Sequence, residues 1–281
     1  MSLDQYVVAI PSYKRAETLK SKTLSMLKSN KISSKKIHVF VANNEEKKTY
    51  ESTLDKNSYG KIIVGIVGMK NIRNFISNYF PENTYILNLD DDLSSIDYLE
   101  NPKKVSKIIN LDKFVKDAFR YAESQGANLW GVYAVANPFF MNYGISSGLY
   151  YIVGAMWGSK NVHKKKIKVT IDDKEDFERS LLYYKEDGLV IRYNYVTIRT
   201  KYYKEQGGMQ VTRTSDRVTK SAHYLINKYP SLCELNTNKK SAKTELKFRK
   251  QEKNKRLKID RKAPLYNKIK KVSKTEKIYK K

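Results

Sequence analysis

Cysteine, tryptophan and histidine are scarce in this sequence of 281 residues, which has one, two and three of them. A lone Cys233 excludes an intramolecular disulfide and a four-cysteine zinc site, and it fits a reducing compartment. No window approaches the roughly eighteen apolar residues of a membrane span, and the N-terminus lacks the pattern of a signal peptide. We therefore expect no membrane contact and a location in the cytoplasm or the interior of a host cell.

Negative charge is also in short supply. The 55 lysines and arginines outnumber the 29 acidic residues, and the formal net charge is +26. Such an excess goes beyond what solubility needs and indicates a polyanionic partner, with nucleic acid as the first candidate. The abundance of Lys, Asn, Ile and Tyr is typical of an AT-rich genome, such as that of a virus or phage.

Short apolar runs alternate with amphipathic segments in the first third of the chain. The runs cover residues 6–10, 37–42, 61–66 and 84–89, and the segments cover residues 17–28, 45–54 and 70–79. This alternation predicts βαβ units and therefore an α/β fold, a mostly parallel sheet flanked by helices. The C-terminal ends of such strands share one edge of the sheet, where ligands bind.

The pattern after residue 92 is less regular. We predict helices at residues 111–124, 173–185 and 215–229, and strands at residues 129–135, 149–153 and 189–200. This half is expected to receive the acceptor. From about residue 241 the sequence is rich in Lys and Arg, and it fits either a basic helix or a solvated, mobile tail.

Three consecutive carboxylates follow the apolar run at residues 84–89. Their mutual repulsion costs stability unless a cation relieves it, and Mg²⁺ or Mn²⁺ prefers carboxylate oxygen. If the strand continues through them, Asp90 and Asp92 point to one side and can share a metal, while Asp91 faces elsewhere. The structural alternative is an acidic turn that caps a following helix.

Two basic segments follow predicted strands. Residues 11–15 (Pro-Ser-Tyr-Lys-Arg) join the first strand to the first helix, where backbone N–H groups and cations favour a diphosphate or a base. A glycine-containing loop at residues 65–74 leads into a helix, although it is neither a P-loop nor a dinucleotide fingerprint. Its Arg73 could reach a phosphate or hold the last aspartate of the triplet, or it could be a solvated residue on a helix face.

Further candidates lie in the second half. The acidic run at residues 172–178 could supply a general base for an acceptor hydroxyl, although helix N-termini also collect carboxylates for dipole reasons. His223 is either a ligand or an ordinary surface histidine. For nucleic-acid contacts we single out basic residues of the predicted strand and of the tail. They are Arg192, Arg199, Lys247, Arg249, Lys250, Lys255 and Arg256.

In this order the motifs resemble the GT-A glycosyltransferases of the family 2-like kind. They look most like the TET-associated glycosyltransferases, the group that includes the base J glucosyltransferase. The motifs that carry the resemblance lie between residues 6 and 229, outside the basic tail. They are residues 11–15, Gly68 to Asn74, Asp90 to Asp92, Glu175-Asp176 and Gly207-Gly208-Met209.

The resemblance implies a role for each of these positions. Donor binding would fall to residues along the first 92 positions and to one tryptophan: Pro11, Tyr13, Arg15, Asn43 (or Glu45 in its place), Arg73, Asp90, Asp91 and Trp157. The metal would be held by Asp92, Asp90 and the late His223. Asp176 would be the catalytic base, and the neighbouring Glu175 could exchange roles with it. A core aromatic is the alternative for Trp157.

The implied activity is an inverting, metal-dependent transfer of a sugar, glucose by the resemblance, from a UDP-sugar to a hydroxyl group. DNA that carries hydroxymethyluracil or hydroxymethylcytosine fits the basic surface as acceptor. Residues 1–92 would form the nucleotide-sugar half, residues 93–237 the acceptor half and residues 238–281 a basic tail.

Two other functions remain open from the residues alone. Clustered carboxylates on a basic protein also suit a metal-dependent nuclease or nucleotidyltransferase. A non-catalytic nucleic-acid-binding protein would use the charge and the 22 tyrosines for stacking on bases. The residues at 11–15 and the late histidine favour nucleotide-sugar binding over the nuclease or nucleotidyltransferase. The acidic triplet counts against the non-catalytic protein, because it repels phosphate unless a metal is bound.

Overall fold

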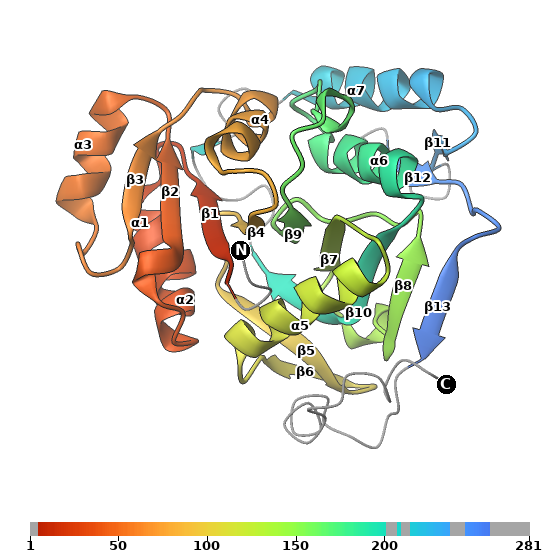
Figure 1. Ribbon diagram of the computed structural model, residues 1–281, viewed down its shortest axis with the longest axis horizontal. Coiled ribbons are helices and arrows are strands. Elements are labelled where there is room, and N and C mark those ends of the chain that lie inside the picture. The colour runs from red at the N-terminus through yellow and green to blue at the C-terminus, as the bar shows by residue number, and fades with distance from the viewer. Residues whose placement is uncertain (1–4, 201–206, 209–213, 237–244, 259–281) are drawn as a thin grey trace.

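A computed structural model describes residues 5–200, 207–208, 214–236 and 245–258. In these residues a mixed sheet carries helices on both faces (Figure 1). The strands are β1 (Val7–Pro11), β2 (Ile37–Val41), β3 (Lys61–Val64), β4 (Tyr85–Leu89), β5 (Ser95–Asn101), β6 (Lys104–Lys107), β7 (Leu129–Tyr133), β8 (Gly144–Gly148), β9 (Met156–Lys160), β10 (Val190–Arg199) and β13 (Lys255–Lys258). A separate small sheet pairs β11 (Cys233–Leu235) with β12 (Leu246–Phe248).

The helices are α1 (Ala16–Leu19), α2 (Ser25–Ser29), α3 (Asn44–Thr53), α4 (Met69–Tyr79), α5 (Leu111–Ser124), α6 (Glu175–Asp187) and α7 (Ser215–Lys228). A π-helical segment, Lys20–Leu24, joins α1 to α2 without a break. Short 3₁₀ turns occupy Ser34–Lys36, Pro138–Phe140 and Lys165–Ile167. None of the helices described is long and apolar enough to cross a membrane.

The N-terminal half is the predicted parallel sheet, in the order β3-β2-β1-β4. Alternate residues of these strands face opposite layers, as the pleat requires. Val8 and Val39 pack on the layer of α1, α2 and α3, whereas Ala9 and Phe40 pack against α4. The α/β architecture expected from the sequence is therefore confirmed.

The C-terminal half adds both parallel and antiparallel pairs. Strand β9 runs antiparallel to β4 and to β7, so β7 points the same way as β4, and β10 is parallel to β7. The C-terminal ends of β1, β4, β7 and β10 therefore meet at one edge. Helix α5 covers one face of this half and α6 the other, with α7 outside α6 (Figure 1).

Two expectations for this half are corrected, and one hairpin was not anticipated. Residues 149–153 form no strand; they lie in the connection between β8 and β9. The hairpin of β5 and β6 was not predicted. Residues 245–258 form neither a helix nor a separate tail, because β12 pairs with β11 and β13 continues the main sheet beside β8.

Trp130 on β7 is the largest fully buried side chain of the core. Its ring meets those of Phe114, Phe119 and Tyr193 edge to face, with centroids 5.3 to 6.0 Å apart. Gly158 on the neighbouring β9 makes room for the indole, because a Cβ there would lie 2.2 Å from the ring. The core of this half is thus built around one aromatic cluster.

Candidate functional site

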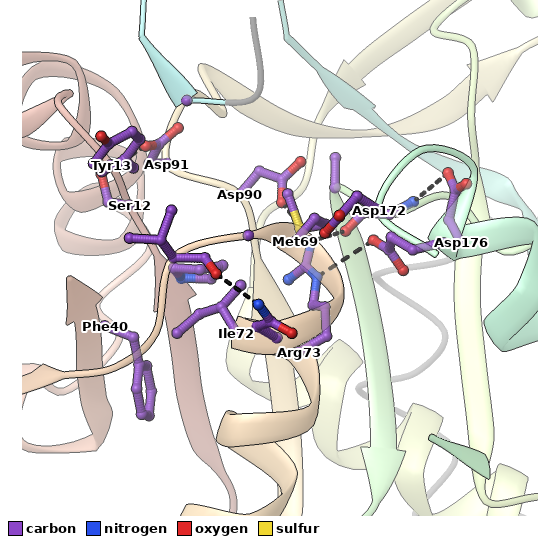
Figure 2. A pocket seen from close by; sticks show the side chains of 18 of the residues that line it. Ser12, Tyr13, Phe40, Met69, Ile72, Arg73, Asp90, Asp91, Asp172 and Asp176 are labelled. Carbon is purple, nitrogen blue, oxygen red and sulfur yellow. Dashed lines mark hydrogen bonds and ion pairs between the residues drawn. The ribbon is translucent and has the colours of Figure 1, made fainter. Parts of the chain in front are cut away.

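A pocket of about 560 Å³ opens at the shared edge of the parallel strands (Figure 2). This volume suits a small-molecule ligand. Segments far apart in the sequence line it: the ends of β1 and β2, the start of α4, the turn after β4, Tyr151, residues 153–155, the start of α6, Gly208 and Arg217.

The three consecutive aspartates line this pocket, but they lie in a turn after β4 and not in the strand. The predicted alternation is therefore wrong, because it assumed strand geometry through residue 92. Asp91 is 4 % exposed and accepts a hydrogen bond from Ser12 Oγ at 2.6 Å, and Arg15 Nη1 lies 3.2 Å from it. Burial raises the pKa of Asp91 to about 7, although Arg15 and Ser12 oppose the shift.

Asp90 and Asp92 are the less buried members of the turn. Arg73 Nη2 donates to Asp90 at 2.9 Å, and Arg15 Nη1 stands 3.8 Å from Asp92. Burial, and then the negative charge of Asp90, raises the pKa of Asp92. The negative charge of Asp90 thus opposes that of Asp92, a repulsion that a bound cation relieves.

Thr23 fixes the shape of the acidic turn from the π-helical segment. Its buried hydroxyl donates to the carbonyl of Asp90 at 2.8 Å and accepts from the N–H of Leu93 at 3.0 Å. One side chain therefore clamps both ends of the turn.

Replacing Thr23 with valine should lower the free energy of unfolding by about 1–3 kcal/mol, because two buried backbone groups lose their partners while the shape is kept. Urea unfolding measures this loss. Thr23→Ser retains the hydroxyl and should recover most of it. Equal stability of the valine and serine variants would contradict the clamp.

Arg73 connects the acidic turn to α6. The side chain is 6 % exposed, and it contacts Asp90, the carbonyl of Gly154 at 3.1 Å and Glu175 at 3.4 Å. Its Nη1 is buried without a hydrogen-bond partner in the described residues. The guanidinium is therefore engaged in positioning carboxylates, which leaves it little freedom to bind a diphosphate.

Glu175 lies between two arginines. One carboxylate oxygen faces Arg73, and the other accepts from Arg179 Nη1 at 2.6 Å. Arg179 in turn stacks on the ring of Trp157, 4.0 Å from its centroid. Trp157 is buried beneath this layer and does not line the pocket, so its predicted place beside a sugar gives way to the core alternative.

Asp176 is more accessible than Glu175 and lines the pocket on the side away from Asp91 (Figure 2). The Tyr151 hydroxyl donates to its Oδ2 at 2.5 Å, and the Gly154 N–H donates to the same atom at 3.3 Å. The carboxylate is therefore held in one orientation at the first turn of α6.

Arg217 enters the pocket from the first turn of α7, a position the sequence analysis did not single out. It pairs with Asp173 at 3.2 Å and reaches Asp172 at 3.8 Å. Asp172 also accepts from the N–H of Lys70 at 2.9 Å and so caps α4. A cation in the first turn of a helix is unfavourable with respect to the helix dipole. The unusual position of Arg217 was therefore the one feature of the sequence that could have indicated a functional role.

The glycine pair of the late motif packs on the loop after β1. Gly208 N–H donates to the Tyr13 carbonyl at 3.0 Å, and Arg15 Nη2 donates to the Gly207 carbonyl at 3.1 Å. Both glycines have positive φ, and a Cβ on either would come within 3.0 Å of Lys14 or Arg15. Met209 lies outside the described residues.

The structure brings nine of the predicted site residues to this pocket. They are Pro11, Tyr13, Arg15, Arg73, Asp90, Asp91, Asp92, Glu175 and Asp176. Asn43 is elsewhere, because its side chain caps α3 by accepting from the N–H of Glu46 at 2.8 Å. His223 is exposed on α7 and does not line the pocket. A ligand role for it is therefore not supported; Arg217 is the residue of α7 that reaches the site.

The residues predicted to bind nucleic acid lie on β10, on and just after β12, and on β13, and none of them lines the pocket. Arg199 pairs with Asp97, and Lys247 and Arg249 both pair with Glu234. Lys250, Lys255 and Arg256 are exposed at the end of the described chain. Arg192 is partly buried on β10.

No protein-family model and no curated protein sequence matches the chain. Among solved structures, residues 1–349 of S. aureus TarS are similar, with a TM-score of 0.44 and 14 % identity over 69 % of this chain and 60 % of that chain. The mannosyltransferase PcManGT from Pyrobaculum calidifontis, in complex with GDP-Man and Mn²⁺, is also similar. Its TM-score is 0.41 and its sequence identity 10 %, over 70 % of this chain and 55 % of that chain.

Glucosyl-3-phosphoglycerate synthase from Mycobacterium tuberculosis, in complex with Mn²⁺, UDP and glucosyl-3-phosphoglycerate, gives a TM-score of 0.43 and 9 % identity over 83 % of this chain and 84 % of that chain. The chain thus spans about 60 % of the first of these structures.

Proposed function

We propose that the chain is a metal-dependent, inverting glycosyltransferase of the GT-A kind. It moves glucose from UDP-glucose to a hydroxyl group, and its acceptor is hydroxymethylated pyrimidine in DNA. The observation that carries the proposal is the pocket at the edge of the parallel strands, which holds the acidic turn on one side and Asp176 on another (Figure 2). Transfer from a nucleotide-sugar needs these two kinds of carboxylate.

The acidic turn fits a divalent cation that is shared with the donor. Within the described ranges, no group of three or more His, Cys, Asp or Glu side chains could hold a metal unaided. Mg²⁺ and Mn²⁺ need only one or two carboxylates when substrate phosphates and water complete the shell. Asp92 and Asp90, which repel each other, are those carboxylates. The bound cation supplies positive charge to the leaving diphosphate.

The apolar part of the pocket suits the base of the donor. Tyr13, Phe40 and the exposed pair Ile66 and Val67 line the side formed by β1, β2 and the loop after β3. A nucleotide base presents flat faces that pack on such side chains. Arg217 and Lys174 line the opposite, charged side and would stand near the diphosphate.

Asp176 is the base that accepts the proton of the acceptor hydroxyl. Both oxygens of Glu175 contact arginines, and its side chain is buried, so Glu175 positions Arg73 and Asp90. Tyr151 and Gly154 orient Asp176 without a cation. One base that acts from the face opposite the leaving group gives inversion at C1. An α-linked product from an α-linked donor would contradict this step.

DNA as the acceptor is supported by charge. The net charge of +26 and the exposed Lys255 and Arg256 of β13 favour a polyanion over a neutral sugar or lipid. To present a hydroxymethyl group from a duplex, the base would have to leave the stack.

Donor binding tests the enzyme class directly. Thermal unfolding should rise by several degrees with UDP-glucose and Mn²⁺ together and by less with either alone, because each supplies part of the other's site. GDP-mannose serves as the nucleotide control. The nuclease alternative would show instead as cleavage of plasmid DNA with Mn²⁺ and indifference to every nucleotide-sugar.

A further inference from the structure

Arg192 is a cation on β10 beside the donor pocket. Its Nε donates to Asn194 Oδ1 at 2.9 Å, and its Nη1 approaches the Tyr151 carbonyl at 3.4 Å. The guanidinium also faces the rings of Tyr133 and Tyr150, 5.3 and 4.9 Å from their centroids. Neutral groups therefore hold Arg192 in place.

No carboxylate among residues 5–200, 207–208, 214–236 and 245–258 forms an ion pair with Arg192. The other arginines of this region differ, since Arg73, Arg179 and Arg217 each contact an acidic side chain. Burial lowers the pKa of Arg192 to about 10, and the charge of Arg256 adds to the effect. A partly buried cation without a counter-ion favours an anionic ligand.

Strand pairing places Arg256 in the same row as Arg192. Ser146 on β8 is opposite Arg192 on one side and opposite Arg256 of β13 on the other. Residues opposite each other on paired strands point to the same face of a sheet. The two guanidinium groups therefore project from one face, and Ser146 between them is too small to screen either.

Tyr151 joins this row to the proposed catalytic base. Its carbonyl accepts from Arg192, and its hydroxyl donates to Asp176. Tyr151 is therefore the one residue that links an anion held at Arg192 to Asp176, the carboxylate that would activate the acceptor.

The loop between β7 and β8 points to nucleic acid as the source of that phosphate. It starts after Tyr133 and returns at Asn142, whose N–H approaches the carbonyl of Asn194. Its tip carries Phe139 and Phe140, which are 83 % and 55 % exposed and meet edge to face at 5.0 Å. Exposed aromatic rings on a basic protein can stack on unpaired bases.

We propose that Arg192 and Arg256 form a phosphate subsite for the acceptor strand of DNA, with Phe139 and Phe140 as a platform for a neighbouring base. The inference rests on the proposed function for its choice of acceptor. Beyond that function, it specifies the face of the sheet that binds the DNA strand. It also names the residues that let the enzyme distinguish a polymeric acceptor from a free nucleoside.

Salt dependence of binding tests the subsite without any turnover. We would measure binding of a single-stranded oligonucleotide with one hydroxymethylated pyrimidine by fluorescence anisotropy from 50 to about 300 mM NaCl. Arg192→Gln and Arg256→Gln should each reduce the slope of log K against log salt by about 0.7, the value for one lost contact to a single strand. Arg192→Lys should keep the slope. Arg120→Gln removes the same charge from α5, on the other face, and is the matched control.

Transfer assays separate this inference from the function on which it rests. Arg192→Gln should raise KM for the oligonucleotide at least tenfold and leave KM for the free hydroxymethyl nucleoside unchanged. If the nucleoside is glucosylated but Arg192→Gln and Arg120→Gln have the same slope and KM, the subsite is wrong and the enzyme class stands. If no nucleotide-sugar is used but the slope still falls, the subsite stands and the glycosyltransferase fails. Unchanged binding in the double Phe139→Ala, Phe140→Ala variant would overturn the aromatic platform.

Discussion

Asp176→Asn should lower kcat for transfer to a good acceptor by roughly 10²–10⁴-fold, the usual contribution of a general base. The amide keeps the shape and can still accept from Tyr151 and Gly154, so the geometry around it persists. What it loses is the capacity to take a proton. Initial rates of UDP release at saturating acceptor measure the effect.

Asp176→Asn should leave donor binding unchanged, because the contacts of Asp176 lie with Tyr151, Gly154 and Phe177 and not with the acidic turn. The rise in unfolding temperature with UDP-glucose and Mn²⁺ should match that of the unaltered protein. Asp117→Asn on α5, far from the pocket, controls for loss of one carboxylate. A variant that binds donor normally and transfers at full rate would remove Asp176 from the mechanism and favour Glu175 as the base.

Rescue by azide is a second test of proton transfer to Asp176. As an anion it needs no deprotonation, so its nitrogen can form a bond to C1 while the bond from C1 to the diphosphate breaks and UDP leaves. Azide should therefore restore turnover to Asp176→Asn and not to a variant that has lost the cation. A lack of rescue together with normal donor binding would count against proton transfer as the lost function.

The local elements of this fold could be predicted because their signals are local. Helix α5 has the bounds expected from its apolar periodicity, and β1, β2, β3 and β4 lie within two residues of the apolar runs that indicated them. The segment at residues 149–153 misled for a physical reason. Its apolar side chains are buried by packing on α6, where the N–H of Ile152 donates to Ser180 Oγ at 3.1 Å, and not by a ladder of strand hydrogen bonds.

Long-range pairings could not be predicted from the sequence. β13 adds to β8 across more than a hundred residues, and nothing in the basic composition of residues 255–258 announces an edge strand. The hairpin of β5 and β6 is similarly tied to β10. These contacts decide that residues 245–258 belong to the domain.

Some residues of the candidate site could likewise be predicted from local sequence signals, and others could not. Motifs adjacent to strand ends, such as Arg15 and Arg73, were found because the edge of a parallel sheet collects them. Tyr151, Lys174 and Arg217 reach the pocket through loop and helix placements that only the folded chain specifies. Burial then separates neighbours that the sequence left interchangeable, because Glu175 is enclosed by arginines and Asp176 is accessible.

Asp92→Asn should reduce kcat/KM by roughly 10³-fold, the rate equivalent of about 4 kcal/mol, because the leaving diphosphate loses the cation that the turn would hold. The folded state should be little affected. The ion contact of Asp92 with Arg15 is a distant one at 3.8 Å, and removing the charge of Asp92 also relieves the repulsion from Asp90. Asp92→Asn should therefore lower activity without lowering the stability of the folded protein.

Because activity and stability should change differently, their measurement distinguishes a metal-binding role of Asp92 from a structural one. Asp92→Asn should unfold at an equal or higher temperature than the unaltered protein without Mn²⁺, and the additional stabilisation by Mn²⁺ with UDP-glucose should disappear. Asp216→Asn, an exposed carboxylate on α7 that pairs with Lys220, should change neither quantity. If Asp92→Asn lowered stability and still responded fully to Mn²⁺, the carboxylate would serve the turn and the cation would be held elsewhere. Retained response with lost activity would instead place Asp92 beside the sugar.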